Sequence, residues 1–358
     1  MRDWKAKVEN VRKKLEEIDI DAILINHLPN IRYLTGFSGS SALCVITREK
    51  SFFITDFRYR EQAKIQVKGF KRLIAVNESF FELIERKKIL KGLRKIGFEA
   101  EHLAFLTLAK IRAKFKKIKL IPTYNFIEEI SAIKTNEEIK FINEAIRISE
   151  KVFNEVLNLI KPGISEVEIA SEISYLQRRN GAERDAFDII VASGWRGALP
   201  HGVATNKKIK KGELVVIDFG CVYNGYHSDI TRTIAVGKIS SEAKKIYNIV
   251  LEAQERAIEA VRPGMRANEL DAVARKFIKA KGYGKFFKHS LGHGIGTEIH
   301  TIPSISPRSD YVLKDGNVIT IEPGIYIPGF CGVRIEDDIL INSTAQILTT
   351  LPKNLIEL

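Results

Sequence analysis

The sequence contains little cysteine and no long apolar segment. Its 358 residues include three cysteines, Cys44, Cys221 and Cys331, and none of them has C-x-x-C spacing. This excludes a disulfide scaffold and a structural zinc finger, and favours small thiols packed in a core. No apolar run approaches the roughly 20 residues needed to span a bilayer, and the N-terminus is charged rather than signal-like. We therefore expect a soluble, cytoplasmic protein.

The basic charge is concentrated in one part of the chain. The net charge is +13, and residues 1–128 hold 27 Lys and Arg against 15 Asp and Glu, a net charge of +12. In segments 86–95 and 110–119 the basic residues alternate with apolar ones, which predicts the exposed faces of amphipathic helices. The charge therefore does not by itself indicate a nucleic-acid partner, and we do not expect nucleic acid as the main ligand.

Length and pattern predict two domains with a mixed α/β (α+β) fold. A hydrophobic content of 45% over 358 residues is enough for roughly two cores. A small N-terminal α/β domain is expected over residues 1–128, and a second, larger domain over residues 129–358. The second domain begins before a Thr135-x-x-Glu138 capping box that opens a long helix. Strand-like runs of the first domain lie at 21–26, 41–47, 51–55, 72–76, 96–99 and 119–121.

The second domain contains an internal repeat. Helix-ending Pro-Gly pairs at 162–163 and 263–264 are offset by 101 residues, and two apolar strands that each end in an acid and a glycine are offset by 104. A second acid in each half follows at an offset of 107. We interpret this as a duplicated helix, helix, strand-hairpin unit with a pseudo-two-fold axis. The axis would bring together four acids: Asp218 and Asp229 from one half, Glu322 and Glu336 from the other.

Four carboxylates that converge in a protein interior require positive charge. They cannot all stay ionised alone, and two divalent cations would neutralise them. His289 and His293 have the i, i+4 spacing of a helical zinc motif, but glycines at 292, 294 and 296 disfavour a helix there. We therefore reject the helical zinc motif and expect the backbone of this segment to run close to a ligand.

Several motifs resemble those of one enzyme family. They are P-H-G at 200–202, V-I-D-F-G at 216–220, S-D-I-T-R-T at 228–233, H-S-L-G-H-G-I-G at 289–296, I-E-P-G-I-Y at 321–326 and G-V-R-I-E-D at 332–337. Together they resemble the Xaa-Pro aminopeptidase and prolidase family, which has the pita-bread catalytic fold. The segment N-I-R-Y-L-T-G-F-S-G-S at 30–40 is similar to the N-terminal domain of these enzymes.

The resemblance implies roles for ten residues. It implies a homodimer with two divalent metal ions, manganese, cobalt or zinc. The metal ligands would be Asp218, Asp229, His293, Glu322 and Glu336. Glu322 would also act as proton shuttle, and the other catalytic residues would be His201, His300 and Arg334, with His289 and Tyr326 in substrate binding. Thr301 stands where many relatives carry Glu, which affects the polarity around the centre and not the ligand set.

The expected function is a dinuclear metal-dependent exopeptidase that removes the N-terminal residue from peptides with proline in second position, an Xaa-Pro aminopeptidase. The alternative is an Xaa-Pro dipeptidase (prolidase), and behind it a methionine aminopeptidase. A metal-free enzyme of the creatinase type is disfavoured by the complete set of ligand types. From a different class, a non-catalytic pita-bread binding protein would use the basic N-terminal domain, for example for RNA.

Overall fold

The computed structural model describes residues 4–358 and divides into two compact units, one up to Ser131 and one from Ala132 onward. Each unit has its own hydrophobic core. Within the described residues, no helix combines the length and apolar character that crossing a membrane requires.

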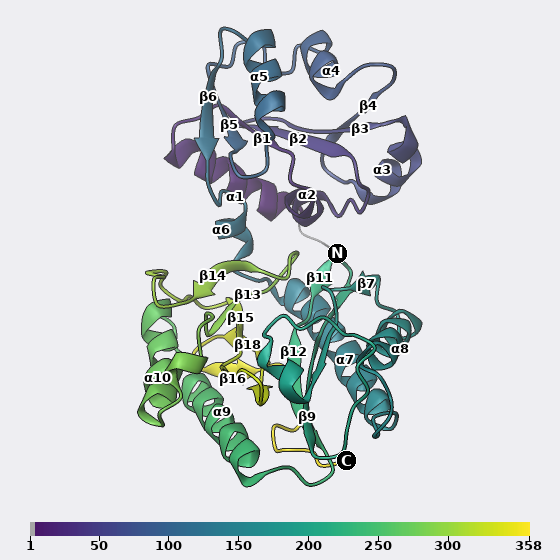
Figure 1. The fold of residues 1–358 in the computed structure, drawn as a ribbon. Coiled ribbons are helices and arrows are strands. Elements are labelled where there is room, and N and C mark those ends of the chain that lie inside the picture. The colour runs from purple at the N-terminus through teal and green to yellow at the C-terminus, as the bar shows by residue number, and fades with distance from the viewer. Residues whose placement is uncertain (1–3) are drawn as a thin grey trace. The chain divides into compact units, whose positions relative to one another are not determined.

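The first unit is built on a six-stranded mixed sheet, visible in Figure 1. The strand order is β4-β3-β2-β1-β5-β6, with β1 antiparallel to β2 and parallel to β5. Each strand overlaps a run predicted from the sequence. Their bounds are β1 Ala22–Ile25, β2 Ala42–Thr47, β3 Ser51–Asp56, β4 Lys71–Ala75, β5 Lys95–Glu99 and β6 Lys119–Thr123.

Helices cover both faces of this sheet. Because strand side chains alternate, Ile23 packs with α1 and α2, whereas Leu24 packs with α4 and α5. The sheet is therefore buried on both sides. The helices of the unit are α1 Trp4–Glu17, α2 Leu28–Thr35, α3 Arg60–Gln66, α4 Phe80–Arg86, α5 Phe105–Lys114 and α6 Glu128–Ser131.

The helix predicted over residues 86–95 is wrong. Helix α4 ends at Arg86, and turns follow in which Lys88 has φ 53° and Gly92 has φ 85°. A left-handed residue cannot continue a right-handed helix, so the backbone reverses at these positions. In the segment 110–119, helix α5 continues only to Lys114.

Two helix pairs form the outside of the second unit. The predicted capping box of Thr135 with Glu138 opens α7, and a second capping box, Ser165 with Glu168, opens α8. Each box satisfies N–H groups that the first helical turn leaves unpaired. The first pair is α7 Asn136–Leu157 and α8 Glu166–Arg179, and the second is α9 Ser241–Ala260 and α10 Ala267–Ala280.

Each helix pair packs on strands of its own half, which confirms the predicted duplicated pita-bread architecture. In the first half β9 (Glu213–Phe219) pairs antiparallel with β12 (Ile230–Val236) and β8 (Ile190–Ser193). In the second, β15 (Val318–Ile321) pairs antiparallel with β18 (Asp337–Ile341). Figure 1 shows α7 and α8 on one side of these strands and α9 and α10 on the other.

Shorter strands complete the unit. They are β7 Arg184–Asp185, β10 Cys221–Tyr223, β11 Tyr226–His227, β13 Gly292–Gly294, β14 Thr301–Ile305, β16 Gly324–Ile327, β17 Cys331–Arg334 and β19 Ala345–Ile347.

Apolar side chains hold the helices against the strands. Ile173 of α8 packs with Val215 and Ile217 of β9, and Leu270 of α10 packs in the same core as Ile319 of β15. Each side chain is fully buried or nearly so, and burial of such a residue contributes about 1.5–3 kcal/mol. The strand ends that follow these residues are thereby held in place. The three cysteines are free and buried, as expected.

Candidate active site

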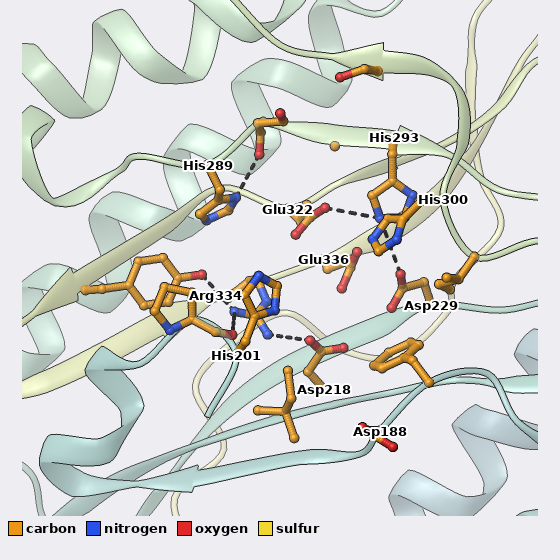
Figure 2. Close-up of a pocket in the computed structure, with 18 of the residues that line it drawn as sticks. Asp188, His201, Asp218, Asp229, His289, His293, His300, Glu322, Arg334 and Glu336 are labelled. Atoms are coloured by element: carbon orange, nitrogen blue, oxygen red, sulfur yellow. Dashed lines mark hydrogen bonds and ion pairs between the residues drawn. The ribbon is translucent and has the colours of Figure 1, made fainter. Parts of the chain in front are cut away.

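One cavity of about 610 Å³ in the second unit contains all ten residues singled out from the sequence. Figure 2 shows the acids and the histidines facing one another across it. The ten lining residues are Asp218, Asp229, His293, Glu322, Glu336, His201, His300, Arg334, His289 and Tyr326.

The four acids come from corresponding positions of the two halves. Asp218 lies on β9 and is the register partner of Thr231 on β12, and Asp229 directly precedes β12. Glu322 directly follows β15, and Glu336 directly precedes β18. Packing of the two hairpins therefore brings together carboxylates that are more than 100 residues apart in sequence.

His293 projects from the short strand β13 toward the acids. Its Nε2 atom lies 3.4 Å from a Glu322 oxygen and 3.5 Å from an Asp229 oxygen. The Nδ1 atom lies 3.1 Å from the Gly294 carbonyl oxygen, which assigns the proton to Nδ1 and leaves the Nε2 lone pair directed at the acids. Burial, followed by the neighbouring His300, lowers the pKa of His293 to about 3, so the imidazole is neutral.

The carboxylates destabilise one another's charged forms. Burial, followed by repulsion from Asp218, raises the pKa of Glu336 to about 8. The pKa of Asp229 and that of Glu322 are also raised, first by burial and next by Glu336. A bound cation would reverse this effect, because it would stabilise the ionised form of each acid.

The donor atoms fit a divalent metal centre rich in oxygen ligands. Asp229, His293 and Glu336 each offer one ligand atom, and these atoms all lie within 4.8 Å of one another. Among the described residues, the buried Oδ1 atom of Asp218 has no hydrogen-bond partner. A buried carboxylate oxygen without a donor is costly, and a metal ion would satisfy it.

Two residues missed by the sequence analysis support the acids across the two halves. The Thr231 hydroxyl donates to Glu336 Oε2 at 2.6 Å, and the Asp229 N–H donates to Asp338 Oδ2 at 3.2 Å. Thr231 and Asp338 are themselves related by the 107-residue offset, each two residues after an acid. Thr231 therefore orients the Glu336 carboxylate, and Asp338 holds the backbone of Asp229. The repeat offset pairs these two positions, but it does not indicate which group either side chain contacts.

Arg334 on β17 fixes Asp218. One guanidinium nitrogen, Nη2, donates to Asp218 Oδ2. Nη1 donates to the Tyr326 hydroxyl at 2.8 Å and to the Pro200 carbonyl at 3.2 Å, and Nε donates to the Thr231 hydroxyl at 3.1 Å. All three guanidinium nitrogens donate hydrogen bonds, so the position of the guanidinium is fixed. It pairs with one oxygen of Asp218 and leaves the other oxygen for the proposed metal centre.

Three histidines surround the acids. His300 lies with its ring centroid 4.3 Å from that of His293, and burial lowers the pKa of His300. Burial, with Arg334 next, lowers the pKa of His289 to about 3. His289 and His300 are therefore neutral near pH 7. His201 is exposed on the segment that follows the short 3-10 helix η2 (Gly194–Ala198).

The buried carboxylate of Glu166 holds the segment that carries His201. It accepts bonds from the backbone and hydroxyl of Ser193 at 2.8 and 2.9 Å, and from those of Thr205 at 3.2 and 2.9 Å. Arg196 of η2 donates to the same carboxylate at 3.2 Å. Both ends of the segment are thus attached to one fully buried group at the start of α8.

Comparison with known proteins decides the family. Residues 140–343 match metallopeptidase family M24, and residues 7–133 match the creatinase/prolidase N-terminal domain. The chain belongs to metallopeptidase family M24. Membership implies divalent metal ions and a hydrolase that cleaves peptides, as expected from the sequence.

Several members of M24 are similar to this chain over nearly its whole length. The Xaa-Pro dipeptidase of Pyrococcus furiosus is 44% identical over 98% of this chain and 100% of its own. The solved structure of an Xaa-Pro dipeptidase from Bacillus anthracis has a TM-score of 0.94 and 45% identity, covering 99% of this chain and 100% of that one. An X-Pro aminopeptidase from Thermotoga maritima has a TM-score of 0.90 and 40% identity, covering 97% and 100%.

Proposed function

We propose that this protein is an Xaa-Pro dipeptidase that uses two divalent metal ions. The observation that carries the proposal is the convergence of four carboxylates, three of them buried and that of Glu322 half-buried, and one neutral imidazole on a single cavity. The similarity to Xaa-Pro dipeptidases over the full chain favours this activity over the aminopeptidase that was our first expectation.

The metal ligands in this proposal are Asp218, Asp229, His293, Glu322 and Glu336. Four carboxylates match the charge of two divalent ions, and oxygen ligands with one imidazole suit manganese, cobalt or zinc. When bound, such ions supply Lewis-acid polarisation of the scissile carbonyl and activation of water near neutral pH.

Glu322 is the proposed proton shuttle. Its carboxylate lines the cavity and accepts a bond from the Thr320 hydroxyl at 3.3 Å, which orients it toward the centre of the site. It would take a proton from the attacking water and give it to the proline nitrogen as the C–N bond breaks. Proline nitrogen carries no hydrogen in the peptide, so this proton is required for the amine to leave.

The histidines would bind the substrate. Neutral His300 can donate an N–H to the oxyanion that develops on the scissile carbonyl, and exposed His201, which lines the same cavity, can do so from the segment after η2. His289 and Tyr326, whose rings lie 5.4 Å apart, would form the part of the wall that contacts the substrate. Arg334 would keep Asp218 in its ligating orientation.

A peptide panel tests the proposal. Protein loaded with Mn²⁺, Co²⁺ or Zn²⁺ is assayed for release of the first residue from Met-Pro, Met-Pro-Ala and Met-Ala. We expect Met-Pro to be cleaved most efficiently and Met-Ala least. Faster cleavage of Met-Pro-Ala would favour the aminopeptidase, which the similarity to the Thermotoga maritima enzyme keeps as the second candidate. Cleavage of Met-Ala alone would overturn both.

The oligomeric state is a separate part of the proposal. The sequence resemblance implies a homodimer. Sedimentation of the metal-loaded protein should give twice the chain mass of 40.5 kDa. A species of 40.5 kDa at micromolar concentration would contradict the dimer.

A further inference from the structure

Asp188 is an acidic residue of the cavity that the proposed chemistry does not use. Five acidic residues line the cavity, and the other four are the proposed metal ligands. Asp188 is exposed, and within the described part of the chain no hydrogen bond or ion pair of its side chain is recorded. Its carboxylate is therefore available to a ligand, whereas the other four acids are the proposed metal ligands.

Its position relative to the proposed centre follows from the strand register. Asp188 precedes β8 by two residues, and Ile190 at the start of β8 is the register partner of Asp218. Two extended residues advance about 6–7 Å along the chain. Figure 2 shows Asp188 beyond Asp218, on the wall contributed by the first half. A substrate side chain that extends along this wall from the residue being cleaved off would have to be long to reach the Asp188 carboxylate.

Apolar residues form part of the wall of the cavity that Asp188 lines, and one of them, Phe187, directly precedes it in the sequence. Phe187, Ile190, Val203 and Ile299 line the same cavity. A cavity that offers both apolar wall and an exposed acid matches a side chain with a long aliphatic stem and a cationic head, since Lys and Arg bury the stem while the head stays hydrated. A short or acidic side chain would leave the walls uncovered or meet like charge.

The protein itself supplies no free cation for Asp188 within this cavity. Arg334 is the one arginine among the lining residues, and no lysine is present. The Arg334 side chain is 4% exposed and donates to Asp218. Asp188 is therefore open, within this cavity, to a cationic side chain that the substrate brings.

We propose that Asp188 makes the site prefer Xaa-Pro substrates whose first residue is lysine or arginine. This inference rests on the proposed dipeptidase function. The group recognised is the side chain and not the α-ammonium, because every dipeptide carries the latter and it would create no preference. An exposed pair of this kind contributes up to about 1 kcal/mol, which corresponds to a preference of roughly threefold to fivefold.

The test compares kcat/KM for Lys-Pro and Met-Pro, whose side chains are both long and unbranched. In Mn²⁺-loaded protein at low salt, the ratio should be roughly threefold to fivefold in favour of Lys-Pro and should fall at high salt. In Asp188→Asn the ratio should approach one. Asp310→Asn, the same change at an exposed acid outside the cavity, should keep the original ratio.

A charge-reversed variant gives a second, opposite readout. Asp188→Lys should raise kcat/KM for Glu-Pro relative to Met-Pro and lower that for Lys-Pro. If Asp188→Asn leaves the ratio of kcat/KM for Lys-Pro to that for Met-Pro unchanged, the assignment of Asp188 is overturned while the dipeptidase function stays in place. If the wild-type protein cleaves none of the dipeptides, the proposed function is overturned, and the preference with it.

Discussion

Replacing Thr231 with valine tests whether Glu336 is a metal ligand held from the other half of the repeat. The Thr231 hydroxyl is fully buried, donates to Glu336 Oε2 at 2.6 Å and accepts from Arg334 Nε at 3.1 Å. Valine keeps the shape and removes both bonds. The Glu336 carboxylate can then rotate, and one guanidinium N–H is left without an acceptor.

This change should lower both the free energy of unfolding and the affinity for metal. A hydrogen bond to a charged group contributes about 1.5–3 kcal/mol, and a buried donor left unpaired costs about 1–3 kcal/mol. We therefore expect Thr231→Val to lower the free energy of unfolding of the metal-free protein by roughly 2.5–6 kcal/mol. Loss of a group that orients a metal ligand lowers metal affinity about 10-fold to 100-fold.

Thr233 offers a matched control two residues along the same strand. Its hydroxyl is equally buried, but it donates to the Arg334 carbonyl at 2.9 Å and accepts from the Arg334 N–H at 3.1 Å. Thr233→Val should therefore destabilise the fold without reaching Glu336. Thr231→Ser, which keeps the hydroxyl, should restore metal affinity.

The assay is calorimetric titration of Mn²⁺ into each metal-free variant, together with urea unfolding. The reasoning predicts that both valine variants lose stability and that only Thr231→Val loses metal affinity. Equal metal affinity in the two valine variants would refute the role of Thr231, and wild-type affinity in a Glu336→Gln variant would refute Glu336 as a ligand.

Three further predictions concern the proton shuttle, the acids and a buried ion pair. Glu322→Gln should lower kcat by about 10²-fold to 10⁴-fold with little change in thermal unfolding, because it removes the proposed shuttle and a ligand charge while keeping the shape; turnover at the wild-type rate would contradict the role. Since the pKa of Glu336 is raised to about 8 in the folded state, the folded metal-free protein binds more protons than the unfolded chain between about pH 4.5 and 8. Its stability in urea should therefore fall as the pH rises from 6 to 8, and saturating Mn²⁺ should abolish this fall; an increase in stability over that range would contradict the mutual repulsion of the acids. Arg232→Met should lower the free energy of unfolding by about 3–5 kcal/mol in urea, because it leaves Asp337, now 2.7 Å from Arg232, as a buried carboxylate short of its main cation; a loss under 1 kcal/mol would show that Lys353, 3.5 Å from Asp337, compensates.

Local patterns in the sequence were sufficient for most elements and for the composition of the site. Strand-like runs predicted the strands of the first unit, and the capping box at Thr135 predicted where α7 begins. The repeat offsets predicted that two hairpins would present matching acids. These signals are local or periodic, so they do not depend on contacts between distant segments. The helix predicted at 86–95 failed because left-handed residues such as Lys88 are not visible in an amphipathic pattern.

Only the tertiary structure decided which atoms meet. The sequence could not indicate that Thr231 bonds to Glu336, that Arg334 neutralises one oxygen of Asp218, or that Glu166 holds the segment carrying His201. Each of these contacts joins residues from different elements, and the direction of a side chain across a packed interface depends on the backbone of both partners. The sequence by itself determined that acids and a histidine would gather in the second unit. The packing of the two halves determined their orientation, their burial and hence their charge.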